Sequence, residues 1–394
     1  MIKAVILAGG NGVRMQPMTF TRPKPLLQVI DKTILEHNLD SLEGLVKEVI
    51  IVIGYKGDMI RALIGDNYKK IKIRYVIQEE QVGTGDAAKK SLDFLDDKFI
   101  LLNGDDVYSK EDIRKVLKKC PSILLGKVKN PSFFGVVEYS GKVVSNLVEK
   151  PEKFPEKSMV NTGLYFLDKS IFDFKIDKSL RGEYEFTDYI RALLLNEDLY
   201  FKEAEKWIPV SYPWNLLEAN EKLMDDVKRD IKGLVENNCT IEGNVTIERG
   251  AIIKNGSYIK GPAYIKEGAV IGPGSIIYGK TIVGKNSSIE GNSEIKNSII
   301  KNNTTVKSLC YIGDSIIGDN CVLEAGVILN NSLNGKEIKS VIKDKEINTE
   351  RFNFGSIIGD NVKIGANSSL TPGIMIDSEL TVGQSSLIDK NINH

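Results

Sequence analysis

The hydrophobic positions of this 394-residue chain follow two different rhythms, one in each half. In the first half, continuous apolar runs at residues 3–7, 49–53 and 99–102 alternate with helix-like stretches at 34–45 and 85–95. Strands that are buried on both faces of a sheet give such uninterrupted runs. The alternation of strand and helix predicts an α/β fold with a mostly parallel sheet.

A hairpin and a linker complete the first half. Residues 134–139 and 142–148 flank a Ser-Gly turn, which predicts an antiparallel hairpin added to the sheet. The charged stretch at 219–236 is interpreted as a helical linker. The pattern therefore predicts an α/β domain at residues 1–218, the linker, and a second domain at residues 237–394.

From residue 241 onward, an aliphatic residue recurs every sixth position. The sixteen matching positions are Ile241, Ile247, Ile253, Ile259, Ile265, Ile271, Ile277, Val283, Ile289 and Ile295, then Ile358, Ile364, Leu370, Ile376, Val382 and Ile388. If about one residue in three were aliphatic, chance would give this agreement roughly once in ten million cases or less. A six-residue repeat predicts a parallel β-helix, in which each repeat forms one side of a triangular coil. The break at residues 330–355 predicts an arm that projects from the coil.

Composition narrows the range of partners. Lysine plus arginine and aspartate plus glutamate are equal at 53 each, so no overall charge favours nucleic acid or an anionic membrane. No apolar stretch reaches 18 residues, and the run at residues 1–7 is too short for a signal peptide. The four cysteines form no Cys-x-x-Cys pair and are interpreted as small buried hydrophobic residues. We expect a cytoplasmic protein.

The first strand ends in Ala8-Gly9-Gly10-Asn11-Gly12-Val13-Arg14-Met15, and Pro23-Lys24-Pro25 follows. Glycines directly after a strand let backbone amides approach a bound anion, because no Cβ is in the way. Arg14 and Lys24 add positive charge on the same stretch, so the pattern predicts a nucleoside triphosphate site. A dinucleotide-binding loop would need a third glycine at Met15, and a Walker-type loop would need a Gly-Lys-Ser/Thr tripeptide. A plain glycine turn would not explain the two cations.

The string Leu7-x-Gly9-Gly10-x-Gly12-x-Arg14-Met15-x-Pro17-Met18-Thr19, closed by Pro23-Lys24-Pro25-Leu26, resembles the signature of the sugar-1-phosphate nucleotidylyltransferases. These enzymes join a sugar-1-phosphate to a nucleoside triphosphate and release pyrophosphate. The resemblance implies a Rossmann-like first domain in which Leu7 and the three glycines bind the nucleotide. It also implies that Arg14 meets the outer phosphates and Lys24 the α-phosphate. The chain departs from many members at Val13, where they have Ser or Thr.

A metal site is expected beside the phosphates. Asn103-Gly104-Asp105-Asp106 follows a buried strand, and ligands bind at the carboxyl ends of strands in open α/β sheets. Mg²⁺ prefers a carboxylate, waters and phosphate oxygens. The resemblance implies Asp105 as its ligand and Asn215 as the partner ligand, whereas Asp106 is predicted to be a turn residue. Uridylyltransferases that make UDP-N-acetylglucosamine tend to have Asn at this late position, and thymidylyltransferases have Asp.

The base and the sugar are assigned to later strings. An amide side chain can pair with the imide edge of uracil or thymine, and the resemblance implies that Gln78, with Gly83 and Thr84 beside it, does so. UTP or dTTP is therefore favoured over GTP, although a solvated strand end also explains a lone glutamine. The residues implied to bind the sugar phosphate, expected to be glucose- or N-acetylglucosamine-1-phosphate, are Gly135, Glu149, Lys150, Asn161, Thr162 and Tyr165. Glu185 either faces this site or serves as a carboxylate at a helix N-terminus.

The six-residue repeat resembles the hexapeptide-repeat family, which implies a left-handed β-helix and packing as a homotrimer or a larger homo-oligomer. Some archaeal relatives with this domain order also acetylate an amino-sugar phosphate from acetyl-CoA, and they carry a catalytic His before a Gly-Asp-Ser string. Ser308 stands at that place here, and a serine hydroxyl does not accept a proton near neutral pH. The other matching residues of such a vestigial site are Tyr311, Asn331, Lys336 and Lys339.

Three classes of function remain open from the sequence. The first is a nucleotidyltransferase, and the second is a bifunctional enzyme that also transfers acetyl groups. The third is a non-catalytic regulatory or assembly module. The presence of Arg14, Lys24 and Asp105 argues against the third class, because a module without catalysis would not need these charges.

Overall fold

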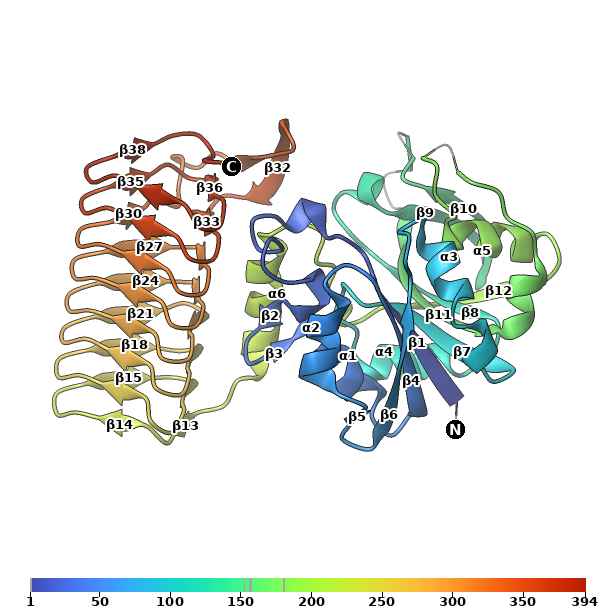
Figure 1. Cartoon of the computed structure of the whole chain (residues 1–394), viewed down its shortest axis with the longest axis horizontal. Helices are drawn as coiled ribbons and strands as arrows, with labels where there is room; N and C mark the ends of the chain where they lie inside the picture. The colour runs from blue at the N-terminus through green and yellow to red at the C-terminus, as the bar shows by residue number, and fades with distance from the viewer. Residues whose placement is uncertain (1, 152, 156–157, 180) are drawn as a thin grey trace. The chain divides into compact units, whose positions relative to one another are not determined.

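The computed structural model describes residues 2–151, 153–155, 158–179 and 181–394. The chain forms two compact units (Figure 1). The first, here called the sheet unit, comprises Met1–Asn11, Arg22–Gln28 and Lys32–Val210. The second, here called the β-helix unit, comprises Gly12–Thr21, Val29–Asp31 and Ser211–His394. Part of the glycine-rich signature therefore belongs to the β-helix unit.

The sheet unit is built on one twisted sheet that has ten strands within the described residues, in the order β5-β6-β4-β1-β7-β11-β8-β12-β10-β9. Its strands are β1 (Ile2–Ala8), β4 (Val46–Ile53), β5 (Asn67–Tyr68), β6 (Ile71–Ile77), β7 (Lys98–Asn103), β8 (Ser122–Gly126), β9 (Gly135–Ser140), β10 (Val143–Glu149), β11 (Met159–Asp168) and β12 (Leu199–Glu203). The four strands β6, β4, β1 and β7 are parallel, as the continuous apolar runs predict. The predicted hairpin is the antiparallel pair β9–β10.

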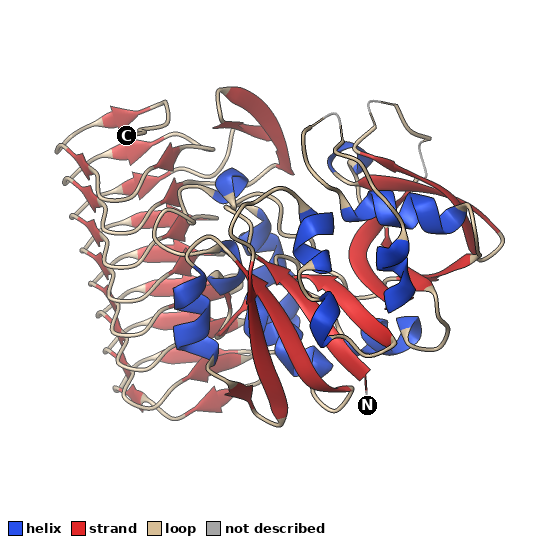
Figure 2. Cartoon of the chain, turned by 45° about the vertical axis from the view of Figure 1, so that its right-hand side comes forward, coloured by secondary structure: helices blue, strands red, loops and turns tan. Residues whose placement is uncertain are grey.

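Helices cover both faces of this sheet (Figure 2). The helices of the unit are α1 (Ile34–Leu42), α2 (Gly57–Ile64), α3 (Thr84–Lys89), α4 (Lys110–Val116) and α5 (Phe186–Leu194). Alternate residues of β1 face opposite sides, as strand geometry requires. Ile6 packs in one core cluster with residues of α1, α2 and α4, and Val5 packs in the other with residues of α3 and α5. Short 3₁₀ helices and the small β2–β3 pair, Gln28–Val29 with Lys32–Thr33, complete the connections.

The second half forms a parallel β-helix with three flat sides, each an eight-stranded parallel sheet within the fully described residues 230–388 (Figure 1). One side holds β13 (Asp230–Ile231), β16 (Val245–Ile247), β19 (Ala263–Ile265), β22 (Thr281–Val283), β25 (Ile299–Ile300), β28 (Ile316–Ile317), β33 (Ile357–Ile358) and β36 (Met375–Ile376). The second holds β14 (Leu234–Val235), β17 (Ile252–Ile253), β20 (Val270–Ile271), β23 (Ser288–Ile289), β26 (Thr305–Val306), β29 (Val322–Leu323), β34 (Lys363–Ile364) and β37 (Thr381–Val382). The third holds β15 (Thr240–Glu242), β18 (Tyr258–Lys260), β21 (Ile276–Tyr278), β24 (Glu294–Lys296), β27 (Tyr311–Gly313), β30 (Ile328–Leu329), β35 (Ser369–Leu370) and β38 (Leu387–Ile388).

The predicted inward positions form the core of this β-helix. Fifteen of the sixteen belong to one buried cluster, and the first of them, Ile241, packs partly buried against it. The same cluster also contains aliphatic residues outside the sixteen predicted positions. Six of them continue the inward series between Ile295 and Ile358: Ile300, Val306, Ile312, Ile317, Leu323 and Leu329. Between Ile295 and Ile300, and again between Ile312 and Ile317, one corner of the coil is shorter by one residue. The inward position survives because the missing residue lies in the turn and not in a strand.

Residues 330–355 leave the coil at that same corner. They form an antiparallel hairpin of β31 (Ile338–Ile342) and β32 (Lys345–Arg351), and the coil resumes at Ile357–Ile358. These residues are called the arm below.

The predicted helical linker needs a correction. The helix α6 spans Asn215–Leu223, and a 3₁₀ turn at Met224–Asp226 ends it. The chain then enters the first coil, where β13 and β14 already lie before residue 237. Local composition favours a helix here. The backbone amide of Leu234 instead donates to the carbonyl of Ala251 in the next coil, so its hydrogen-bonding need is met by strand pairing. Within the described residues, none of the helices has the length and apolarity needed to span a membrane.

Candidate active site

The glycine loop, Gln78 and Asp105 lie at the carboxyl edge of the parallel strands. Leu7 pairs with Asn103 of β7, and its carbonyl accepts a hydrogen bond from Gly104 at 2.8 Å. A Cβ on Gly9 would lie 3.3 Å from the side-chain oxygen of Gln78, which follows β6. A Cβ on Gly10 would meet no atom within 4 Å, so its backbone is open to a ligand. This edge is where open α/β sheets bind their ligands.

A short ion pair joins the predicted cation and the predicted metal ligand. Lys24 Nζ lies 2.6 Å from Asp105 Oδ2. Lys24 and its two flanking prolines are buried, whereas the side chain of Asp105 remains 42% exposed. Long charged side chains are rarely buried without a partner, so the burial of Lys24 depends on this carboxylate. Two groups predicted from separate strings therefore meet in the sheet unit.

The donor set around Asp105 fits a magnesium ion that takes most of its ligands from phosphate and water. Within the described residues, no three His, Cys, Asp or Glu side chains gather as a protein-only metal cage. Mg²⁺ usually binds through one or two carboxylates and keeps several waters or phosphate oxygens, so such a cage is not needed. An exposed carboxylate at the end of a central strand meets this requirement.

Asp106 lies in the bend that follows β7, as the sequence predicts for a turn residue, and its side chain is buried. Its side chain accepts hydrogen bonds from Trp207 Nε1 at 3.1 Å and from the Val210 amide at 3.0 Å. Its carbonyl accepts from the amide of the fully buried Asn38. Burial raises the pKa of the Asp106 carboxyl, and the neighbouring charge of Asp105 adds to that rise. These contacts hold the loop that presents Asp105.

The predicted base-binding residues lie together. Gln78 is buried, and its Nε2 donates to the Gly83 carbonyl at 3.0 Å and to Asp86 at 2.9 Å. Both amide hydrogens are thus engaged, and Oε1 faces Gly9. Gly83 has φ +120°, and a Cβ there would clash with the backbone of Tyr184 at 2.3 Å.

Thr84 supports the same turn from the other side. Its hydroxyl accepts a hydrogen bond from the amide of Phe186, the first residue of α5. This hydrogen bond of the Thr84 side chain therefore joins the predicted base-binding turn to α5.

Five of the six predicted sugar residues lie together. A Cβ on Gly135 would lie 3.1 Å from Glu149 Oε2 and 3.5 Å from the Cβ of Asn161, so only glycine leaves this surface open. Lys150 follows with its Nζ 3.3 Å from Glu149 Oε1. Asn161 donates to Tyr165 Oη at 2.5 Å and accepts from the Gly163 amide, which orients its side chain.

Thr162 and Arg181 change the predicted sugar site. Thr162 is buried, and its hydroxyl donates to the Leu124 carbonyl, so it serves the strand β11. Sequence reasoning missed Arg181, which lies 3.5 Å from Glu149 and donates to Glu185 at 2.6 Å. The two residues lie before α5 and not in a helix, so no helical spacing in the sequence indicated this pair. Glu185 thus faces this cluster, and burial raises the pKa of its carboxyl.

Arg14 and Asn215 belong to the β-helix unit. Arg14 lies over the ring of Tyr212, with its guanidinium carbon 5.7 Å from the ring centroid. Asn215 begins α6, and its Oδ1 accepts hydrogen bonds from the amides of Ser211 and Tyr212 at 3.0 and 2.8 Å. Its Nδ2 donates to Glu218. Both lone pairs of Oδ1 are therefore engaged, and metal binding through Asn215 would require one of these bonds to open.

The residues of the vestigial acetyl-transfer site are only partly together. Tyr311 Oη donates to Asn331 Oδ1 at 3.2 Å, beside Asp314. Ser308 donates weakly to Glu290 at 3.4 Å. The two lysines belong to the arm, where Lys336 is exposed and Lys339 pairs with Glu346 at 2.6 Å.

Comparison with known proteins identifies the family. The model of the nucleotidyl transferase family matches residues 3–226, more than half of the chain. The chain belongs to the nucleotidyl transferase family. A GMPPB C-terminal domain model matches residues 259–351, and a model of the hexapeptide repeat of succinyl-transferase matches residues 355–383. With its three parallel sheets, the second unit is a left-handed parallel β-helix of the hexapeptide-repeat type.

Curated relatives match the chain over almost its whole length. The chain is 40% identical, over 99% of its length and 95% of the relative's, to the bifunctional protein GlmU of Methanocaldococcus jannaschii. It is 32% identical, over 100% of its length and 98% of the relative's, to a bifunctional sugar-1-phosphate nucleotidylyltransferase/acetyltransferase of Sulfurisphaera tokodaii. A solved Bacillus anthracis structure, described as a glucose-1-phosphate thymidylyltransferase, matches 58% of this chain and 98% of its own, with 27% identity and a TM-score of 0.52.

The buried contacts of Asp106 predict a specific loss of stability. Asp106→Asn replaces one acceptor oxygen with an NH₂ group, which then faces either the Trp207 or the Val210 donor. An unsatisfied buried donor costs about 1–3 kcal/mol, and we expect the free energy of unfolding to fall by that amount in denaturant titrations. Asp97→Asn, at the opposite end of β7 with an 88% exposed side chain, is the matched control and should change little.

Proposed function

We propose that this chain transfers a uridylyl or thymidylyl group from UTP or dTTP to a sugar-1-phosphate and releases pyrophosphate. The observation that carries the proposal is the 2.6 Å pair of Lys24 and Asp105 at the carboxyl edge of β7. A buried cation beside an exposed carboxylate at this edge supports the binding of a phosphate and its metal ion. Family membership and the names of the relatives support the same reaction.

The chemistry asks for positioning and charge, not for a general base. The oxygen of a sugar-1-phosphate is already ionised near neutral pH, so it attacks the α-phosphorus in line while pyrophosphate leaves. Lys24 stabilises the charge that develops on the α-phosphate, and Arg14 binds the outer phosphates. A nucleotide that binds at this edge competes with Asp105 for Lys24, which frees the carboxylate to hold a metal ion.

Mg²⁺ is the proposed metal, held by Asp105 with Asn215 as the second protein ligand. When bound, it supplies positive charge to the phosphate oxygens and fixes their orientation. The exposed carboxylate of Asp105 and the amide oxygen of Asn215 are ligand types that this ion accepts. Asn215 favours UTP and N-acetylglucosamine-1-phosphate among the substrates, through the resemblance to the uridylyltransferases that have Asn at this position.

A second candidate function is acetyl transfer in the β-helix unit. It is favoured by the name of the Sulfurisphaera tokodaii relative and by the Tyr311–Asn331 contact, with acetyl-CoA as the donor. Ser308 opposes it, because a hydroxyl cannot take the proton from an amino group near neutral pH. We propose that the coils chiefly assemble the chain into a homotrimer. Exposed aliphatic residues on one coil side, Ile276 and Ile328, support such packing.

Pyrophosphate release should require Mg²⁺, a sugar-1-phosphate and a nucleoside triphosphate together. Asp105→Ala should lower kcat by orders of magnitude, because the charge stabilisation from the metal is lost. Asp97→Ala, at the other end of the same strand, should leave the rate unchanged. Near-normal turnover of Asp105→Ala in a coupled pyrophosphate assay would remove Asp105 from the site.

The position of Gln78 predicts a preference for pyrimidine nucleotides. UTP and dTTP should give a higher kcat/KM than GTP, because a purine cannot offer the imide edge at the same place. Gln78→Leu removes the amide and should lower kcat/KM for UTP by about 10-fold, equivalent to roughly 1.4 kcal/mol, which is within the cost of a lost buried hydrogen bond. Lys89→Leu, an exposed change on the neighbouring helix, is the control. Efficient use of GTP by the unchanged chain would overturn the base assignment.

Acetyl transfer from acetyl-CoA to glucosamine-1-phosphate or galactosamine-1-phosphate should be feeble. A general base contributes about 10²–10⁴-fold, and Ser308 supplies none. Thiol release, measured with and without the amino-sugar phosphate, tests this. Ser308→His should raise the sugar-dependent rate if the remaining site is intact. A robust rate in the unchanged chain would show that another group acts as the base.

A further inference from the structure

One short segment carries the groups that hold Arg14. Residues 211–221 comprise the loop before α6 and most of that helix. Tyr212 lies under Arg14, and its backbone amide is fixed by the Asn215 side chain. Tyr212 also stacks on Trp214, with ring centroids 4.7 Å apart and an interplanar angle of 7°. The direction of Arg14 is therefore set by the place of this segment.

The end of the arm contacts both ends of that segment. At one end, Phe354 packs edge-on against Trp214, with ring centroids 6.0 Å apart. Phe354 is fully buried, and its amide donates to the carbonyl of Asn331 at 2.9 Å, which joins the end of the arm to its beginning. Arg14, Tyr212, Trp214 and Phe354 thus form one continuous row within the β-helix unit.

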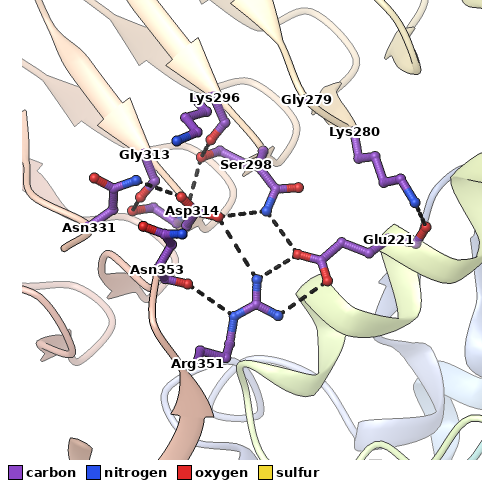
Figure 3. A network of polar contacts seen from close by, with 12 residues as sticks. Glu221, Gly279, Lys280, Lys296, Ser298, Gly313, Asp314, Asn331, Arg351 and Asn353 are labelled. Atoms are coloured by element: carbon purple, nitrogen blue, oxygen red, sulfur yellow. Dashed lines mark hydrogen bonds and ion pairs between the residues drawn. The ribbon is translucent and has the colours of Figure 1, made fainter. Parts of the chain in front are cut away.

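At the other end, Arg351 clasps Glu221 with two nitrogens (Figure 3). Its Nη2 lies 2.5 Å from Glu221 Oε1, and its Nη1 lies 3.3 Å from Oε2. Asn297 donates to both Glu221 and Asp314, and Arg351 Nη2 is 3.9 Å from Asp314. Burial alone would raise the pKa of Glu221, but the hydrogen bonds and charge of Arg351 outweigh it and hold that pKa below its usual range. The carboxylate is therefore kept charged for this clasp.

We propose that Arg351 and Phe354, at the end of the arm, are positioning residues for nucleotidyl transfer. They fix residues 211–221 at both ends and thereby aim Arg14 at the outer phosphates of the nucleotide. This inference rests on the proposed function for the role of Arg14. The arm then has a task in this chain that does not depend on acetyl transfer.

The contacts argue for positioning and not for bulk packing alone. A guanidinium that grips a carboxylate with two nitrogens fixes direction as well as distance. Arg14 is exposed, and Tyr212 is the ring of this row that contacts its guanidinium. The orientation of the Arg14 side chain therefore depends on the position of Tyr212. A small shift of a cation that neutralises phosphate charge is costly, since a misplacement of about 1 Å can reduce the rate about 100-fold.

The test uses the full-length chain and two conservative variants, Phe354→Leu and Arg351→Met. Phe352→Leu is the matched control for the first, because Phe352 lies two residues earlier with a 54% exposed side chain. Arg249→Met, an exposed arginine of the same unit, is the control for the second. The readouts are KM for the nucleotide, KM for the sugar-1-phosphate, the dissociation constant for inorganic tripolyphosphate by calorimetry, and the midpoint of thermal unfolding.

We expect both variants to raise KM for the nucleotide and the tripolyphosphate dissociation constant about tenfold, with KM for the sugar-1-phosphate within twofold of the parent. Arg351→Lys, which keeps one ion pair, should recover part of the loss. Unchanged nucleotide and tripolyphosphate binding in the folded variants would overturn the inference, as would an equal loss of sugar binding. If Arg351→Met does not fold, Phe354→Leu and Arg351→Lys decide the question. If the parent chain releases no pyrophosphate with any substrate pair, the proposed function fails. The positioning role is then tested by comparing the tripolyphosphate dissociation constants of the variants and the parent.

Discussion

The candidate site depends on the parallel pairing of β1 with both of its neighbours. Ala8 lies opposite Ile53 of β4, and Leu7 lies opposite Asn103 of β7. Because the strands run in one direction, the loops that follow them must leave from one edge of the sheet. The glycine loop, the turn that follows β6 and the loop that holds Asp105 are therefore brought together by backbone register alone. Side-chain contacts then fix the positions of these three loops more closely.

Lys24 shows how that refinement works. Its short 3₁₀ helix is not part of the sheet, and burying an unpaired ammonium there would be unfavourable. The carboxylate of Asp105 makes the burial possible, so the cation and the acid define each other's place. Asp106, next in the chain, is held by Trp207 and Val210 from the far end of the unit. The loop is thus fixed from both sides, which keeps its exposed carboxylate in a defined position.

The sequence was informative wherever a pattern repeats or a motif is local. The aliphatic run of β1 and the six-residue ladder follow from burial, and burial leaves a regular imprint on a sequence. Lys24 and Asp105 were each assigned to phosphate chemistry from separate strings, but their ion pair was seen only in the structure. The strand β13 was assigned to a helix, because hydrogen bonds to the next coil override local propensity and leave no local signal.

Contacts between distant residues were not predictable in this way. The sequence near Asp106 does not indicate that Trp207 donates to it, so its turn position was predicted but its buried hydrogen bonds were not. Thr162 sits in a motif that suggests a ligand, yet its hydroxyl is used by Leu124 on a neighbouring strand. Gln78 was placed correctly beside Gly83, but its engagement with Asp86 requires the folded turn. These are partners that only the tertiary fold selects.

The signature is continuous in sequence and yet divided between the two compact units. Lys24 belongs to the sheet unit and takes its position from Asp105, whereas Arg14 belongs to the β-helix unit and takes its position from Tyr212. The two cations expected to neutralise one triphosphate are therefore set by separate scaffolds. The proposed role of Arg351 and Phe354 in nucleotidyl transfer gives the arm a function whether or not the β-helix unit also transfers acetyl groups. The arm contacts residues 211–221 through Arg351 and Phe354, so this positioning role does not depend on an acetyl donor.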